Sequence, residues 1–166
     1  MITKLMDLGR KYLILFGLLK FTAGVLVGFG LGVYFLPILT AEKGLDSAAV
    51  AALETSAERS GVFRRDLKDS DAFHWGEGKI MVNGTTIWLD GAVAPGPDYR
   101  LYLTPEFVET EADFLRIKAQ SAQVGSVKAF ENFSLPVPSS IDPSAYPALI
   151  IWCEAFGQFI TAARLQ

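Results

Sequence analysis

The chain has 166 residues, enough for one domain of ordinary size plus an appendage. From residue 41 onward it carries 11 basic and 17 acidic residues. It therefore lacks the clustered positive charge that phosphate binding requires, and we expect no nucleic-acid partner. Its single cysteine, Cys153, excludes an intramolecular disulfide.

The first predicted element is a transmembrane helix. Residues 21–39 contain no charged side chain, and as a helix they would span about 28 Å, close to the hydrocarbon thickness of a bilayer. The apolar character reaches back to Tyr12, so we assign residues 12–39 to the membrane. Residues 1–40 are predicted to be a cytoplasmic stub and a transmembrane signal anchor.

Two alternatives to a signal anchor are disfavoured. A core helix of a soluble protein would show water a polar face, and this segment is apolar on every side. A cleaved signal peptide would have a shorter apolar region and a small residue three positions before the cut, which Leu39-Thr40-Ala41 does not supply.

Flanking charge predicts the orientation of the helix. Four basic residues precede the uncharged stretch 21–39 (Lys4, Arg10, Lys11 and Lys20), and two follow it within about twenty residues (Lys43 and Arg59). We therefore expect a single-pass protein of the cell (inner) membrane with a cytoplasmic N-terminus. The C-terminal domain would be periplasmic or extracellular.

Small residues recur along one face of the predicted helix. Gly24, Gly28 and Gly32 are spaced by four and would let a second helix approach closely, which favours a homodimer through these positions. Glycine is common in membrane helices in any case, so a monomeric helix stays open as the alternative.

The remaining chain divides into a linker and a β domain. Residues 41–57 are small and polar, with Asp46 or Ser47 able to cap a short Ala-rich helix. Residues 58–166 have short apolar runs separated by Gly, Pro, Asn and Asp, which is typical of a mainly β fold. We predict an antiparallel β-sandwich or barrel-like domain preceded by one transmembrane α-helix.

The clearest local signal is a hairpin over residues 79–89. Asn83-Gly84 joins two alternating runs and favours a two-residue type I′ turn, with Val82 opposite Thr85. The same alternation places Ile80, Val82, Ile87 and Leu89 on the inward side. Further strands are predicted at residues 99–103, 114–118, 130–137, 149–154 and 159–165.

Two soft donors are the candidates for chemistry. Cys153 ends an apolar run in which alternation places it on the face of Leu149 and Ile151. His74 lies between aromatic residues. A thiolate and an imidazole can ligate haem iron or copper, whereas an inert core thiol and a structural histidine are the plainer interpretation. Glu154 would raise the pKa of a nearby thiol by like-charge repulsion.

Four blocks carry a family resemblance: residues 60–63 (SGVF), 73–80 (FHWGEGKI), 96–103 (GPDYRLYL) and 146–156 (YPALIIWCEAF) with 162–165 (AARL). In this order residues 58–166 resemble the DM-thirteen family, a proposed electron-transfer domain found beside DOMON domains. The resemblance implies a β-sandwich-like fold and a redox role for Cys153, as a naked thiol or as a ligand to a prosthetic group such as haem. His74 corresponds to the histidine of the family.

The leading hypothesis is therefore a membrane-anchored extracytoplasmic redox module that uses Cys153 and an unknown redox or envelope partner. The second is a non-catalytic binding or assembly module in which Cys153 is only core. A third is an enzyme whose cleft draws residues from several loops, because a single sequence does not exclude one.

Overall fold

A computed structural model describes residues 11–166. Residues 1–10 of the predicted cytoplasmic stub, which include Lys4 and Arg10, lie outside the described residues. The chain divides into two compact units, one ending at Leu36 and one extending from Pro37 to Gln166, and each is described by itself.

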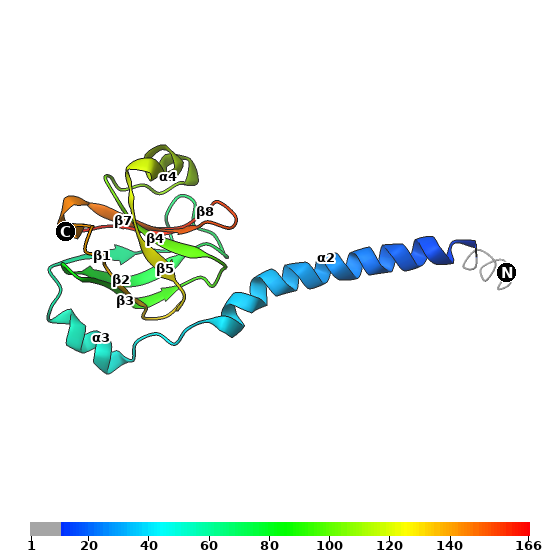
Figure 1. The fold of residues 1–166 in the computed structure, drawn as a ribbon, viewed down its shortest axis with the longest axis horizontal. Helices are drawn as coiled ribbons and strands as arrows, with labels where there is room; N and C mark the ends of the chain where they lie inside the picture. The colour runs from blue at the N-terminus through cyan, green and yellow to red at the C-terminus, as the bar shows by residue number, and fades with distance from the viewer. Residues whose placement is uncertain (1–10) are drawn as a thin grey trace. The chain divides into compact units, whose positions relative to one another are not determined.

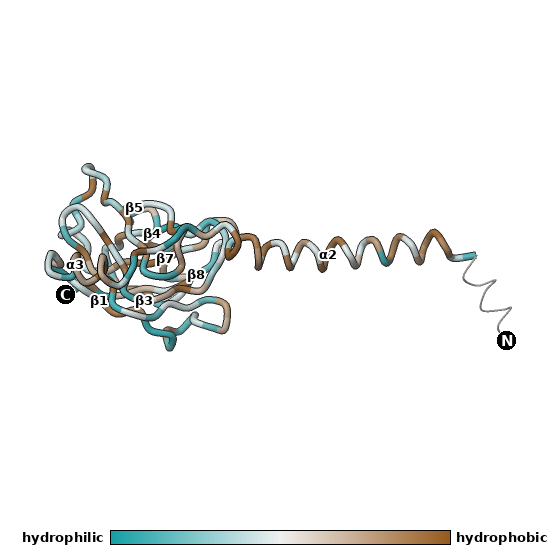
Figure 2. The backbone as a smooth tube through the Cα atoms, turned by 90° about the horizontal axis from the view of Figure 1, so that it is seen from below, coloured by the Kyte–Doolittle hydropathy of each residue, from teal (hydrophilic) through white to brown (hydrophobic). Residues whose placement is uncertain are grey.

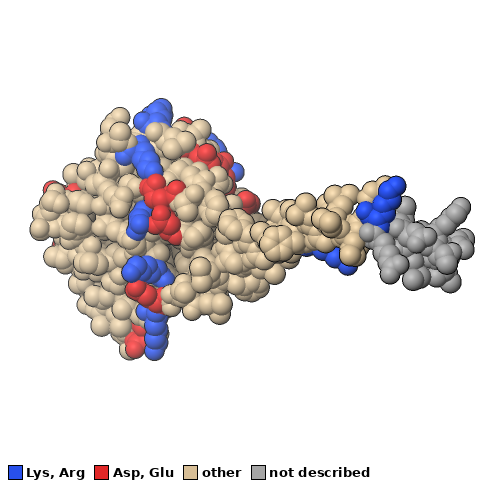
Figure 3. Space-filling model, turned by 45° about the vertical axis from the view of Figure 1, so that its right-hand side comes forward, with Lys and Arg blue, Asp and Glu red and all other residues tan. Residues whose placement is uncertain are grey.

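Helix α2 (Leu13–Thr40) dominates the first unit. None of its residues is buried, and its surface is apolar along nearly its whole length (Figures 2 and 3). Among the described residues it is the one helix long and apolar enough to cross a membrane. Helix α2 is therefore a candidate membrane span. Gly24, Gly28 and Gly32 face open space on it, and their self-association stays a prediction.

The second unit contains two antiparallel sheets of four strands each, which confirms the predicted sandwich (Figure 1). The first sheet has the order β1-β2-β3-β6 and the second β5-β4-β7-β8. The strands are β1 (Arg59–Phe63), β2 (Gly76–Val82), β3 (Thr86–Val93), β4 (Tyr99–Thr104), β5 (Ala122–Val127), β6 (Ser134–Pro136), β7 (Ala148–Cys153) and β8 (Gln158–Arg164).

Two apolar clusters stabilise the domain. The larger one lies between the sheets and includes Ile80, Leu89, Leu101 and Ile151. The smaller one covers the outer face of the second sheet, where helix α4 (Glu111–Ile117) packs Phe114 against residues of β4, β7 and β8. The second sheet is thus buried on both faces, which explains why β7 is apolar without interruption.

The predicted hairpin forms, but its register differs by two residues. Val82 pairs with Ile87 rather than facing Thr85, and the backbone N–H of Asn83 donates to the carbonyl of Thr86 at 3.0 Å. The turn is therefore centred on Gly84-Thr85, with the Asn83 side chain accepting from the backbone N–H groups of Thr85 and Thr86. Because the shift is even, the inward face stays as predicted.

Part of the predicted strand pattern is wrong. Residues 114–118 belong to α4 and to the short 3-10 helix η1 (Lys118–Gln120). Thr110 caps α4 by accepting a hydrogen bond from the backbone N–H of Asp113 at 3.2 Å. Residues 130–137 contribute only the short strand β6, and a second 3-10 helix, η2 (Pro143–Ala145), precedes β7.

The segment that joins α2 to the β domain is bound to the domain. The backbone N–H groups of Glu42 and Leu45 donate to the carbonyls of Lys128 and Asn132. Helix α3 (Ser47–Glu54) follows, capped by Asp46 as the sequence predicts, and it contacts β3. Its Val50 side chain is buried, so residues 42–54 are part of the packed unit.

Candidate functional site

Strand β7 directs Cys153 into the core between the sheets. Leu149, Ile151 and Cys153 belong to the inner cluster, whereas Ile150 and Trp152 belong to the outer one, as strand alternation predicts. Cys153 is the last residue of the strand and is only 3% exposed. The thiol is therefore packed beneath the turn that connects β7 to β8.

The thiol donates a hydrogen bond to the carbonyl oxygen of Pro97, with an Sγ–O distance of 3.0 Å. Burial raises the pKa of Cys153; the backbone N–H groups of Phe156 and Ala155 oppose this shift, and the charges of Asp98 and Glu154 add to it. Cys153 is therefore a protonated thiol at neutral pH while the site stays closed.

The loop before β4 holds the acceptor of the thiol in place. Asp98 has a positive φ of 51°, an uncommon conformation for a residue other than glycine. Its carbonyl accepts from the backbone N–H of Glu154 at 3.1 Å, and its carboxylate pairs with Arg100 at 2.6 Å. This loop thus supplies the acceptor of the buried thiol and is hydrogen-bonded to Glu154, the first residue after β7.

His74 lies in a different environment. Its Nδ1 is 2.9 Å from Oδ2 of Asp71, whose other oxygen accepts from the backbone N–H groups of Phe73 and His74. Burial alone would raise the pKa of Asp71, but the hydrogen bonds from His74 and the backbone outweigh it and lower the pKa. Asp71 therefore orients the imidazole through an ionised carboxylate.

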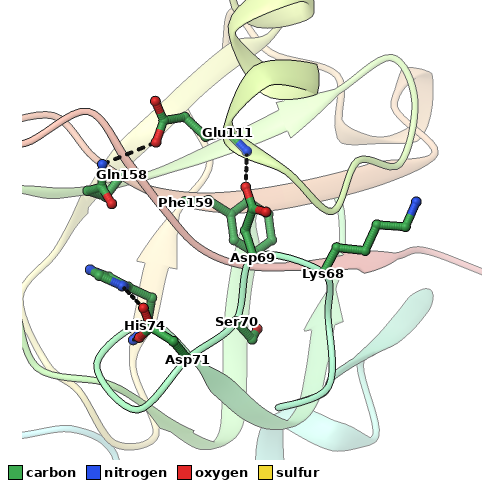
Figure 4. Close-up of a pocket in the computed structure, with 8 residues that line it drawn as sticks. All are labelled: Lys68, Asp69, Ser70, Asp71, His74, Glu111, Gln158 and Phe159. Atoms are coloured by element: carbon green, nitrogen blue, oxygen red, sulfur yellow. Dashed lines mark hydrogen bonds and ion pairs between the residues drawn. The ribbon is translucent and has the colours of Figure 1, made fainter.

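His74 lines an open pocket of about 300 Å³ (Figure 4). Its walls come from the loop over residues 68–71, from Glu111 at the start of α4, and from Gln158 and Phe159 on β8. Glu111 accepts a hydrogen bond from the Gln158 amide at 3.1 Å, and its backbone N–H donates to Asp69. The pocket is therefore mostly polar, with three carboxylates and one lysine among its lining side chains.

The structure does not bring Cys153 and His74 into one site. Gln158 pairs with Cys153 in the sheet and lines the pocket, but the thiol itself points into the core and is absent from the pocket walls. Within residues 11–166, no group of three or more His, Cys, Asp or Glu side chains could hold a metal ion. A haem or copper centre ligated jointly by Cys153 and His74 does not fit this arrangement.

A polar cluster beside Cys153 is not evident from the sequence. The Tyr102 hydroxyl contacts the carboxylate of Glu154, and Nζ of Lys118 lies 2.7 Å from the other oxygen of that carboxylate. Lys118 reaches this position only because residues 111–120 form helical turns that pack on the second sheet. A strand at residues 114–118 gave no reason to place it there.

Sequence comparison identifies the family of the domain. The family model described as Electron transfer DM13 matches residues 66–165, a segment that includes both His74 and Cys153. No significant similarity to a curated protein or to a solved structure was found. The match spans more than half of the chain and contains three of the four blocks named above, those from residue 73 onward. The chain belongs to the DM13 electron transfer family.

Proposed function

We propose that this protein is a membrane-anchored, extracytoplasmic redox module in which Cys153 is the redox group. The family match carries the proposal, because a family described as electron transfer matches the segment that contains the single cysteine of the chain. The apolar helix α2 supports a membrane tether, and the basic residues that precede it support export of the β domain.

One thiol per chain requires a second redox partner. In thiol–disulfide exchange, the Cys153 thiolate forms a bond to one sulfur of a disulfide in a second protein or a small molecule. The S–S bond of that disulfide breaks, and its other sulfur leaves as a thiolate that takes up a proton. Because the pKa of Cys153 is raised and its thiol is covered, we expect exchange to require opening of the 96–98 loop or the turn after β7.

The test uses the full chain in detergent micelles. We expect incubation with oxidised glutathione to add one glutathione to the wild type, detected as a mass increase, and none to Cys153→Ser. Loss of redox activity in cells should accompany both Cys153→Ser and Cys153→Ala. The unfolding midpoint of Cys153→Ala serves as the control for intact packing. A Soret band or bound copper that disappears in Cys153→Ser would instead assign ligation to this residue.

A second candidate function is a non-catalytic binding or assembly module of the cell envelope. The near-complete burial of Cys153 and its hydrogen bond to Pro97 favour this alternative, because a buried Cys commonly acts as a small apolar side chain. It predicts that the thiol reacts only after denaturation. It also predicts that Cys153→Ala keeps full function in the cell.

A further inference from the structure

Tyr102 and Glu154 form a phenol–carboxylate pair on the outer face of the second sheet. Tyr102 is 5% exposed, and its hydroxyl contacts the carboxylate of Glu154 and, at 2.9 Å, the side-chain amide of Gln123. A phenol has one proton to donate, and a carboxylate is the stronger acceptor of the two. With the Gln123 amide turned so that its NH2 group donates to the phenol oxygen, both contacts are satisfied.

The charges around this pair leave the carboxylate able to accept a proton. Burial alone would raise the pKa of Glu154, but hydrogen bonds from Lys118 and Tyr102, together with the charge of Lys118, hold the pKa below its ordinary value. Burial, followed by Glu154, raises the pKa of Tyr102; the charge of Arg100 opposes this and that of Asp98 adds to it. At neutral pH a protonated phenol therefore lies beside an ionised carboxylate.

Cys153 lacks such an acceptor. Its thiol donates to the carbonyl of Pro97, and an amide carbonyl does not take up a proton at neutral pH. Removing one electron from the thiol would leave an acidic proton with no base to receive it. Tyr102 has Glu154 at hydrogen-bonding distance for this purpose, so the proton of the phenol can leave as the electron leaves.

Lys118 gives a further reason why Tyr102, and not another aromatic ring of the smaller apolar cluster, would be oxidised. Its Nζ lies 5.7 Å from the ring centroid of Tyr102 and 5.4 Å from that of Trp152. A positively charged ring radical so close to an ammonium group is unfavourable. Proton transfer to Glu154 removes that positive charge from Tyr102. The ring of Phe114 contacts the rings of both Tyr102 and Trp152, at centroid distances of 5.3 and 4.9 Å.

We infer that Tyr102 is a one-electron redox group of this domain and that Glu154 is its proton acceptor. On oxidation, one electron passes from Tyr102 to a high-potential one-electron oxidant, and the phenolic proton moves to the carboxylate of Glu154. The products are a neutral tyrosyl radical and a protonated Glu154. Reduction returns the electron to Tyr102 and the proton to the phenol. The inference rests on the proposed electron-transfer function but is independent of Cys153.

The experiment oxidises the full chain in detergent micelles with photogenerated ruthenium(III) tris-bipyridine. The background carries Tyr12→Phe, Tyr34→Phe and Tyr146→Phe, so that Tyr99 and Tyr102 are the remaining tyrosines. We expect a tyrosyl radical by transient absorption and electron paramagnetic resonance. The radical should be lost in Tyr102→Phe and kept in Tyr99→Phe, and its formation should slow in deuterated water.

Replacing the base separates proton transfer from folding. Glu154→Gln keeps the shape of the side chain, and we expect radical formation to slow by about 100-fold and to lose its isotope effect. A radical that persists in Tyr102→Phe, a rate unchanged in Glu154→Gln, or no radical at all would overturn the inference. Cys153→Ser should leave the radical unchanged, so that failure of the proposed thiol chemistry is distinguishable from failure of this inference.

Discussion

At the scale of single residues, Arg59 connects the start of the sandwich to its C-terminal end. Its guanidinium donates to the carbonyl oxygens of Pro143, Tyr146 and Leu165, at 3.3, 2.9 and 3.1 Å. These carbonyls come from η2, the loop before β7 and the residue that follows β8, all far from Arg59 in sequence. Arg59→Met keeps the apolar stem of the side chain but leaves the carbonyls without these donors.

We expect Arg59→Met to lower the free energy of unfolding by about 1.5–3 kcal/mol, the range for hydrogen bonds that involve a charged group. Urea unfolding followed by circular dichroism measures this change. Arg64→Met is the matched control, because Arg64 is exposed and its ion pairs are 3.7 and 3.8 Å long. We expect that substitution to cost less than about 1 kcal/mol. Equal effects of the two would contradict a special role of Arg59.

At the scale of elements, the turn between β2 and β3 differs from the turn that the sequence predicts. A type I′ turn with glycine at its second position needs a positive φ there. Gly84 has no φ in that range and faces open space, whereas Gly78 has a φ of +114° and lies against the backbone of Asp90. The same substitution should therefore have a small effect at Gly84 and a large destabilising effect at Gly78.

We expect Gly84→Ala to change the free energy of unfolding by less than about 1 kcal/mol. Alanine restricts the unfolded chain more than glycine does, and this effect favours the folded state. Gly78→Ala should destabilise by more than about 2 kcal/mol, because it adds a clash with the Asp90 carbonyl to an unfavourable φ. Chemical denaturation of both variants provides the comparison. A large loss of stability in Gly84→Ala would contradict the observed turn and indicate a type I′ turn with a positive φ at Gly84.

The same elements show why some of the fold could be predicted from sequence and some could not. Strands β4, β7 and β8 are rich in branched and aromatic residues, so the sequence pattern alone predicts them. Strand β5 is not: its sequence AQVGSV contains mostly small and polar residues, and only pairing with β4 identifies it. At residues 114–118 the apolar residues Phe114 and Ile117 are spaced for a helix, and the Thr110 cap marks its start.

The candidate site, too, can be predicted from the sequence only in part. Cys153 and His74 stand out from composition, and the Asp71–His74 pair is local in sequence. The Tyr102–Glu154–Lys118 cluster joins residues from β4, the turn after β7 and η1. Such a cluster depends on sheet order and on where the helix packs, neither of which a single sequence fixes.

At the scale of the whole molecule, the function depends on which compartment contains the β domain. The Cys153→Ala background frees the chain of native thiols, so that an introduced cysteine reports its own location. Ser140 is exposed in a loop of the β domain, and Lys4 belongs to the predicted cytoplasmic stub. Ser140→Cys and Lys4→Cys, each in this background, therefore report on the two sides of the membrane.

We expect a membrane-impermeant maleimide to label Ser140→Cys in intact spheroplasts and to label Lys4→Cys only after lysis. The proposed orientation follows from the basic residues before the span, which favour a cytoplasmic N-terminus, and an uncharged span is expected to resist extraction. Both variants should remain in the membrane fraction after an alkaline carbonate wash. The reverse labelling pattern, or recovery of the protein in the wash, would contradict this topology. An extracytoplasmic redox role depends on the topology, because an electron acceptor outside the cytoplasm could not reach a β domain inside it.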